Sequence, residues 1–287
     1  MGAEYVLVTD SGCDLSPETL KEWDIGLICL AYLFTDDGVE KKEHEQPLTE
    51  FYAGMRSGRV AKTSAVNEDA FFNLFTPILE AGKDILYLGF SSGLSVTCEN
   101  GKKVANALAE KYPERKIRVV DSLAASAGQG LFVYLGKLNK DNGMSLDENA
   151  DALEADKLHI CHWFTVEDLK YLKRGGRISA ATALLGTALN VKPVLHVDNE
   201  GHLIKITQVH GRKKSIRTMA EKLGATILDG SPIFISQADC MEDAEKLKEI
   251  LKEEYNKDVT MITDIGSVIG AHAGPGTLAL FFRGTER

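Results

Sequence analysis

The chain has 287 residues, of which 44% are hydrophobic, and it carries a formal net charge of −9. This length and apolar content allow one large domain or two ordinary ones with full hydrophobic cores. The negative charge argues against general nucleic-acid binding, because most of the surface would repel phosphate groups.

The chain start and the cysteines bear on the compartment. The opening residues lack the basic segment of a signal peptide. The longest apolar run, residues 25–34, is too short to cross a bilayer, so no stable membrane insertion is expected. The five cysteines include no C-x-x-C pair, which favours reduced thiols and a cytoplasmic location.

The first half of the chain alternates strand-like and helix-like segments, which is typical of a parallel sheet flanked by helices. Ser16 and Asn67 are expected to cap helices, and Pro17 suits a first helical position. Strands are predicted at 5–10, 26–34 (as one strand or two short ones), 84–90 and 117–122, and helices at 15–23, 48–57, 67–81, from about 97 to 112, and 124–138.

The pattern changes after residue 157. Two strand-like segments surround "DNEG" (198–201), which predicts a hairpin. Thr165 and Asp168 have capping-box spacing before a short helix that Gly175 would end. The remaining predicted elements are strands at 158–164, 232–239, 259–265 and 277–282 and helices at 211–223 and 241–255.

The expected fold class is therefore α/β with two domains. Residues 1–157 would form a Rossmann-like α/β domain with a parallel sheet flanked by helices. Residues 158–287 would form an α+β domain with a mixed or antiparallel sheet.

The segment "GFSSG" (89–93) matches the G-x-S-x-G pattern of serine hydrolases. In that interpretation Ser91 is the nucleophile, His272 the base, and Asp239 or Asp264 the acid. No glycine-rich segment that could supply the second oxyanion donor is found. A serine hydrolase or esterase is therefore kept as the alternative function.

The same stretch also fits an anion cradle. Hydroxyl groups and free N–H groups at a helix start can hold a carboxylate or phosphate without cleaving it. Simple helix capping is the competing explanation for each cluster taken alone. The hydroxyl donors of this cradle would come from Ser91, Ser92 and Ser95, with Thr63 and Ser64 from a second loop.

Basic residues gather between residues 170 and 217, which hold ten lysines and arginines against two acids. The arginines around "RGGR" (174–177) could grip a phosphate bidentately, although cations at a helix end are also ordinary dipole partners. A second cluster follows at 210–217, with Arg212, Lys213, Lys214 and Arg217. In an otherwise acidic chain, the two clusters suggest docking with a phosphorylated group or an acidic partner.

Metal and nucleotide sites find little support in the sequence. "HICH" (159–162) places His159 and Cys161 on one strand face, but no second pair stands at ligand spacing, so no metal is expected. A P-loop and a G-x-G-x-x-G pattern are both missing, and no cofactor is predicted. "SVIGAHAGPG" (267–276) places His272 among glycines that allow close approach of backbone or ligand.

Several stretches occur in the order seen in one family. They are "VTDSGCDLS", "KTSAV", "FSSGLSVT", "VVDS", "DLKYLKRGGRIS", "LNVKPVL", "GRKKS" and "VIGAHAGPG". The chain thus resembles the DegV family of bacterial fatty-acid-binding proteins, which includes the FakB-type subunits of fatty acid kinase. The resemblance runs nearly end to end.

This resemblance implies a non-catalytic carrier with two α/β domains and a long-chain fatty acid of the palmitate, stearate or oleate type in a buried tunnel. The carboxylate would meet Thr63, Ser95 and His272, with Ser64, Ser91, Ser92 and Gly93 in the supporting loops. The acid would be presented to a partner fatty acid kinase, which forms an acyl-phosphate for phospholipid synthesis. Arg174, Arg177 and Arg212 match the family's basic motifs on the side that would face this partner. A second alternative is an interaction module in which the lipid only fills the interior.

The chain departs from the family pattern at two places. Residues 65–67 read Ala-Val-Asn where a proline and a serine are usual, and residues 96–98 read Val-Thr-Cys where Gly-Thr-Tyr is usual. Val96 in place of glycine is expected to alter the loop or narrow the pocket at the headgroup.

Overall fold

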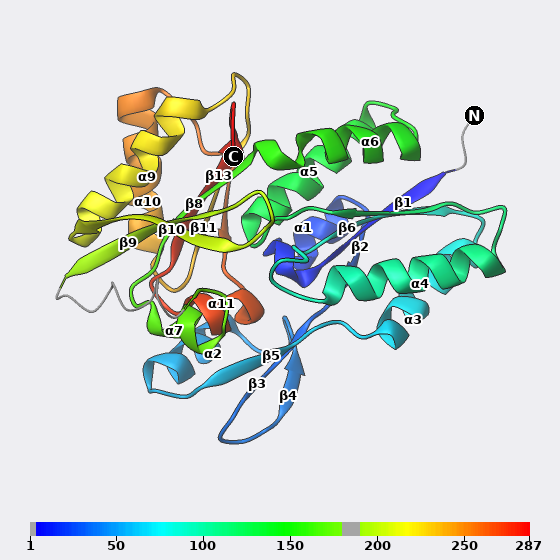
Figure 1. Ribbon diagram of the computed structural model, residues 1–287, viewed down its shortest axis with the longest axis horizontal. Helices are drawn as coiled ribbons and strands as arrows, with labels where there is room; N and C mark the ends of the chain where they lie inside the picture. The colour runs from blue at the N-terminus through cyan, green and yellow to red at the C-terminus, as the bar shows by residue number, and fades with distance from the viewer. Residues whose placement is uncertain (1–3, 180–189) are drawn as a thin grey trace.

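The structure is a computed structural model that describes residues 4–179 and 190–287. Its sheet A consists of β1 (Tyr5–Asp10), β2 (Ile25–Ile28), β6 (Asp84–Gly89) and β7 (Ile117–Asp121). These strands are parallel and lie in the order β2-β1-β6-β7 (Figure 1). The parallel sheet predicted for the first half is therefore confirmed.

Helices cover both faces of sheet A, because the strands are apolar on both sides. They are α1 (Pro17–Glu22), α3 (Glu68–Glu80), α4 (Thr97–Lys111), α5 (Ala127–Asp141) and α6 (Leu146–Asp156). α3 and α4 pack against Ile85 and Tyr87 on one face. α1, α5 and α6 pack against Leu86 and Leu88 on the other.

Helix caps explain where several of these helices begin. The Ser16 hydroxyl accepts a hydrogen bond from the Thr19 amide at 3.1 Å, and the Asn67 side chain accepts one from Ala70 at 2.9 Å, which confirms both predicted caps. α6 is absent from the predicted elements. It is nevertheless preceded by a complete capping box of Ser145 and Glu148, a pattern that is visible in the sequence.

The second half forms a mixed sheet, sheet C, as predicted. Its strands are β8 (Ile160–Thr165), β9 (Val191–Val197), β10 (Leu203–His210), β11 (Ile233–Gln237), β12 (Met261–Asp264) and β13 (Leu278–Arg283). Their order is β10-β9-β8-β13-β11-β12, and only β11 and β12 pair in parallel. The hairpin around residues 198–201 is confirmed.

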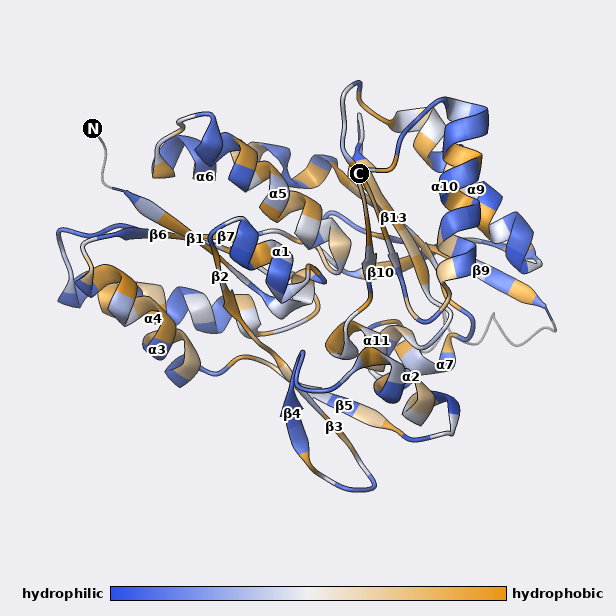
Figure 2. Cartoon of the chain, turned by 180° about the vertical axis from the view of Figure 1, so that it is seen from behind, coloured by the Kyte–Doolittle hydropathy of each residue, from blue (hydrophilic) through white to orange (hydrophobic). Residues whose placement is uncertain are grey.

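One face of sheet C is covered by α9 (Arg212–Thr226) and α10 (Met241–Tyr255). Both helices mix hydrophobic and hydrophilic residues along their length, while the central strands of the sheet are mostly hydrophobic (Figure 2). The apolar side of each helix packs on the sheet, and the polar side remains in contact with solvent.

A third, small antiparallel sheet, sheet B, was not expected. It consists of β3 (Ala31–Phe34), β4 (Glu40–Lys42) and β5 (Ala61–Ser64) in the order β4-β3-β5. α2 (Leu48–Arg56) packs beside it. Of the two alternatives for residues 26–34, the two short strands are found, β2 in sheet A and β3 in sheet B. Strands of three or four residues are too short to show a clear alternation of polar and apolar residues.

α5 lies between the two large sheets, and one hydrophobic cluster joins Leu131 and Leu88 to Phe234 and Phe281 of sheet C. The predicted domains 1–157 and 158–287 therefore share a core. The boundary after residue 157 stays a prediction.

Two short helices stand between sheets B and C (Figure 1). They are α7 (Lys170–Arg174) and α11 (Ser267–Ala273). α7 ends at Gly175, as predicted. The Thr165–Asp168 capping box is wrong, because Thr165 is the last residue of β8, and Asp168 instead accepts a hydrogen bond from the Lys170 amide at 2.8 Å.

Candidate functional site

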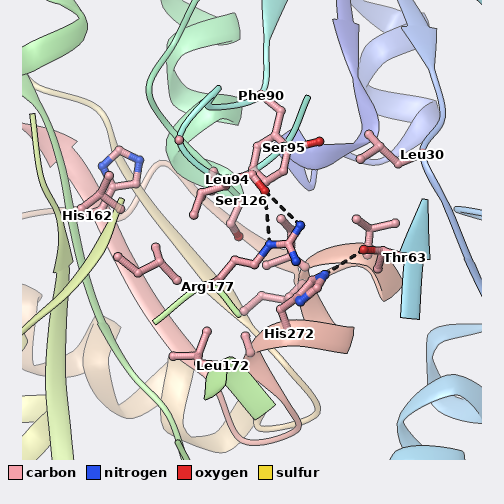
Figure 3. Close-up of a pocket in the computed structure, with 18 of the residues that line it drawn as sticks. Leu30, Thr63, Phe90, Leu94, Ser95, Ser126, His162, Leu172, Arg177 and His272 are labelled. Carbon is pink, nitrogen blue, oxygen red and sulfur yellow. Dashed lines mark hydrogen bonds between the residues drawn. The ribbon is translucent and has the colours of Figure 1, made fainter. Parts of the chain in front are cut away.

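A cavity of about 400 Å³ lies where sheet C, α11, β5 and the loop before α4 meet (Figure 3). Its size is within the range of small-molecule sites. Most of its described walls are apolar, with polar side chains gathered in a few places. The apolar lining includes Leu30, Phe90, Leu94, Ala125, Phe164, Leu172, Val197, Leu203, Val268, Ile269, Ala279 and Phe281.

Thr63 and His272 meet at one end of this cavity. The Thr63 hydroxyl and Nε2 of His272 are 2.8 Å apart, although the residues come from β5 and α11 (Figure 3). Burial, with a smaller effect from the Arg177 cation, lowers the pKa of His272 to about 4, so its imidazole is neutral at pH 7. Gly175 packs against Nδ1 of His272: a Cβ added at residue 175 would lie 2.1 Å from that nitrogen.

Ser95 lines the same cavity from the loop that leads into α4. Its hydroxyl lies 2.9 Å from that of Thr97 and accepts a hydrogen bond from the Thr97 amide at 3.2 Å. The Thr97 hydroxyl in turn accepts from the Val66 amide at 3.2 Å. The structure thus brings all three predicted headgroup residues to one cavity, and their contact with a ligand stays a prediction.

The two departures from the family pattern meet at this place. Val66 is buried, and its amide donates to the Thr97 hydroxyl, so the segment 65–67 is connected to the start of α4 at residues 96–98. Ala65 and Val96 both line the cavity, and Val96 is 61% exposed. An apolar side chain therefore stands at the edge of the cavity beside Ser95.

The three arginines predicted to face a partner are separated. Arg174 is exposed, and its Cζ lies 5.2 Å from the centroid of the Tyr171 ring. Arg177 instead lines the cavity, where Nε and Nη2 donate to the Leu94 carbonyl at 3.2 and 3.1 Å. Arg212 is paired with Asp243 at 2.8 Å.

That these three arginines face a partner or a phosphate stays a prediction. Arg177 is part of the cavity wall, and burial lowers its pKa. Arg177 is also the only cationic side chain among the described residues that line the cavity. It is well placed to attract an anionic group beside Thr63 and His272.

The remaining residues of the predicted cradle occupy different places. Ser92 and Gly93 line the cavity, and so does Ser64, whose hydroxyl donates to Glu40 at 2.8 Å. Gly93 touches the β9–β10 hairpin so closely that a Cβ would stand 2.7 Å from the Glu200 carbonyl oxygen. Glycine is therefore needed at residue 93 for packing.

Ser91 is fully buried, and its hydroxyl donates to the Gly201 carbonyl at 2.9 Å. The acids proposed for a triad contact other residues. Asp239 forms an ion pair with Arg56 at 2.7 Å, and Asp264 accepts a hydrogen bond from the side-chain amide of Gln237. His272 bonds Thr63 rather than Ser91. These contacts give the serine-hydrolase interpretation no support.

Two buried acids hold the start of α11, the helix that carries His272. Glu43 accepts hydrogen bonds from the Ser267 hydroxyl and the Val268 amide, both at 3.0 Å. Asp14 accepts one from the Gly266 amide at 2.9 Å. Burial raises the pKa of Glu43 to about 6 and raises that of Asp14 as well.

Replacing Glu43 by glutamine should therefore change how stability depends on pH. The ordinary pKa of this carboxyl is 4.5, and its pKa in the folded state is about 6. The protonated group therefore favours the folded state at pH values below 4.5, and this contribution to the free energy of unfolding is lost as the pH rises through about 6. Relative to the native chain, Glu43→Gln should gain about 2 kcal/mol in free energy of unfolding between pH 4.5 and pH 7. Urea unfolding across this range measures the difference.

The matched control is Glu45→Gln, because Glu45 is exposed two residues away. Glu45 accepts a hydrogen bond from the Lys42 amide at 2.9 Å, so this variant removes a carboxylate from the same loop without changing the contacts of α11. If the difference in free energy of unfolding between Glu43→Gln and the native chain does not change with pH, Glu43 is not protonated between pH 4.5 and 6.

The polar cavity residues that the sequence did not indicate include Ser126 and His162. Ser126 has φ 56° and ψ −150°, a backbone region that favours glycine, and its hydroxyl bonds Asp14 and Ser236. His162 lies in the cavity wall on β8. In the sequence it stands out only through the "HICH" pattern, which lacks the second ligand pair of a metal site.

Three structural findings bear on other classes of function. Across residues 4–179 and 190–287, no group of three or more His, Cys, Asp or Glu side chains is arranged to hold a metal ion. No helix in the same residues is long and apolar enough to cross a membrane. The five cysteines are free thiols.

Comparison with known proteins gives consistent matches. The model of the DegV family matches residues 4–285. A DegV domain-containing protein of Clostridium perfringens is 41% identical over 99% of both chains. A fatty acid-binding protein of Thermotoga maritima is 29% identical over 98% of both. The structure of a fatty-acid-binding DegV family protein from Thermus thermophilus superimposes with a TM-score of 0.85 at 27% identity, covering 98% of this chain and 99% of that one.

Proposed function

The chain belongs to the DegV family, and on that premise we propose that it binds a long-chain fatty acid of the palmitate, stearate or oleate type in the cavity. This proposal rests on how apolar and polar side chains are distributed over the cavity walls. Apolar side chains line most of them, while Thr63, Ser95, His272 and Arg177 contribute polar or charged groups to the same cavity. Relatives that bind fatty acids share the fold.

The energetics agree with this assignment. Burying a methylene group contributes about 0.8 kcal/mol, so an acyl chain of about 14 methylenes supplies on the order of 11 kcal/mol before ordering costs. A carboxylate carried into the protein needs hydrogen-bond donors or a cation. Thr63 and Ser95 supply hydroxyl groups, and Arg177 supplies the charge.

The experiment is a titration of the delipidated chain with palmitate, with methyl palmitate as the matched ligand. Palmitate should saturate one site per chain. Methyl palmitate should bind more weakly, because an ester cannot carry the charge that Arg177 and the hydroxyl groups stabilise. Failure of palmitate to bind would contradict the proposal.

We further propose that the chain is a non-catalytic carrier in the cytoplasm that presents the carboxylate to a partner fatty acid kinase for acyl-phosphate formation. Arg174 supports a docking surface near the headgroup. It is exposed and directly precedes Gly175, which lies against His272. A partner that contacts Arg174 would therefore reach the end of the cavity where the carboxylate is expected.

Replacing Arg174 by alanine should slow acyl-phosphate formation by a cognate kinase about tenfold, the size expected for one interfacial arginine. Palmitate affinity should not change, because Arg174 lies outside the described lining of the cavity. The rate is measured with radiolabelled ATP and the palmitate-loaded chain. Arg118→Ala, on the far edge strand of sheet A, is the control. Equal rates for both variants would remove Arg174 from the docking surface.

A further inference from the structure

The helix that carries His272, α11, begins without a capping side chain of its own. Its N-cap residue is Gly266, which has no side chain. The first N–H groups of a helix have no partners within the helix, and a buried helix start needs acceptors from other parts of the chain. Ser267 and Val268 are both buried, so the start of α11 needs such acceptors.

Two buried acids supply these acceptors. Asp14 Oδ1 accepts a hydrogen bond from the Gly266 amide at 2.9 Å, and Glu43 Oε1 accepts one from the Val268 amide at 3.0 Å. A Cβ added at residue 266 would lie 3.0 Å from Asp14 Oδ1 and 2.2 Å from Glu43 Oε1. The two acids therefore occupy the space in which the side chain of an ordinary N-cap residue would stand.

Asp14 is in turn held by a residue of the cavity wall. The Ser126 hydroxyl donates a hydrogen bond to Asp14 Oδ2 and lies 2.9 Å from the Ser236 hydroxyl. Ser126 lines the cavity (Figure 3). Its φ of 56° and ψ of −150° are unfavourable for a residue other than glycine, and residues in such conformations cluster at functional sites. Asp14 thus connects the cavity wall at Ser126 to the start of α11.

We propose that Asp14 is a positioning residue for the headgroup end of the cavity. It fixes the start of α11 and thereby holds His272, in the last turn of that helix, 2.8 Å from the Thr63 hydroxyl. The inference rests on the proposed function, because the carboxylate is expected beside His272 and Thr63. Asp14 is not among the described residues that line the cavity, so it acts through α11 rather than by contact with the ligand.

The test replaces Asp14 by glycine, which removes the carboxyl group and suits the φ of 51° at this residue. Palmitate affinity of the delipidated variant should fall about tenfold, a loss of the size expected when one hydrogen bond to a charged group is weakened. Hexadecanol affinity should change far less, because hexadecanol carries no charge for His272 and Thr63 to stabilise. Calorimetric titration measures both affinities.

Asp14→Asn is the conservative variant that should restore binding. The asparagine oxygen can accept from the Gly266 amide, and the asparagine NH₂ group can donate to the Ser126 hydroxyl oxygen. Palmitate affinity should therefore stay close to that of the native chain. Asp24→Gly is the matched control, because Asp24 is exposed and has a similar φ of 55°. It should bind palmitate as the native chain does.

A spectroscopic measurement tests the position of His272 without a ligand. The ¹⁵N resonance of His272 Nε2 in the delipidated chain reports the contact with Thr63. It should shift in Asp14→Gly and stay unchanged in Asp24→Gly. If Asp14→Gly does not fold, Ser126→Gly takes its place, because it removes the hydroxyl group that holds Asp14 and glycine suits the backbone at this residue. Ser126→Gly should shift the same resonance.

The outcomes separate the two proposals. The role of Asp14 is overturned, and the fatty-acid function stands, if Asp14→Gly binds palmitate as the native chain does or leaves the His272 resonance unchanged. Equal losses for palmitate and hexadecanol would also overturn it, because they would indicate general damage to the cavity. If the native chain binds no palmitate, the fatty-acid function is overturned, whereas a shifted His272 resonance in Asp14→Gly would still support the placement of His272 by Asp14.

Discussion

Replacing Thr63 by valine together with Ser95 by alanine is expected to weaken palmitate binding about 100-fold. A hydrogen bond to a charged group contributes about 1.5–3 kcal/mol, so loss of two such donors corresponds to this decrease or more. Both hydroxyl groups line the cavity, and Thr63 also contacts His272 at 2.8 Å. Calorimetric titration of the delipidated variant measures the change.

Hexadecanol separates a headgroup effect from general damage to the cavity. Its affinity should change far less than that of palmitate, because it carries no charge. The control variant Thr49→Val with Ser57→Ala removes two exposed hydroxyl groups from α2 and its end. Equal losses for palmitate and hexadecanol would mean that the hydroxyl groups do not contact the carboxylate.

Replacing Ala279 by phenylalanine should block the cavity and lower palmitate affinity about 100-fold or more. Ala279 is 4% exposed on β13, in register with Phe164 of β8, and lines the cavity. If its added ring excludes about four methylene groups, about 3 kcal/mol of apolar burial is lost. Fluorescence displacement of a bound fatty-acid probe measures the affinity.

The fold should tolerate this change, because the new ring enters open space rather than a filled core. Urea unfolding of Ala279→Phe tests that expectation. Ala109→Phe adds the same ring on the exposed side of α4 and should leave palmitate binding unchanged. Native-like affinity in Ala279→Phe would show that the acyl chain lies elsewhere.

Local sequence signals predicted the frame of the molecule well. Capping side chains such as Ser16 and Asn67 set where helices begin through contacts within three residues. The hairpin around residues 198–201 is similarly local. Sheet B escaped prediction because its strands are short and depend on pairing between distant segments, such as Tyr32 with Thr63.

The candidate site depends on contacts that local patterns do not contain. Thr63 and His272 are 209 residues apart in sequence, and only their shared family motifs indicated that they meet. The orientation of the Arg177 side chain is fixed by its hydrogen bonds to the Leu94 carbonyl, and residue spacing in the sequence does not predict this contact.

The most direct measurement is mass spectrometry of the ligand extracted from chain purified out of a bacterial host, with its amount compared with that of protein. We predict close to one long-chain fatty acid for each chain, and far less from Ala279→Phe prepared in parallel. If the purified protein yields no fatty acid and takes up none when palmitate is added, this result contradicts the assignment of the cavity to a fatty acid.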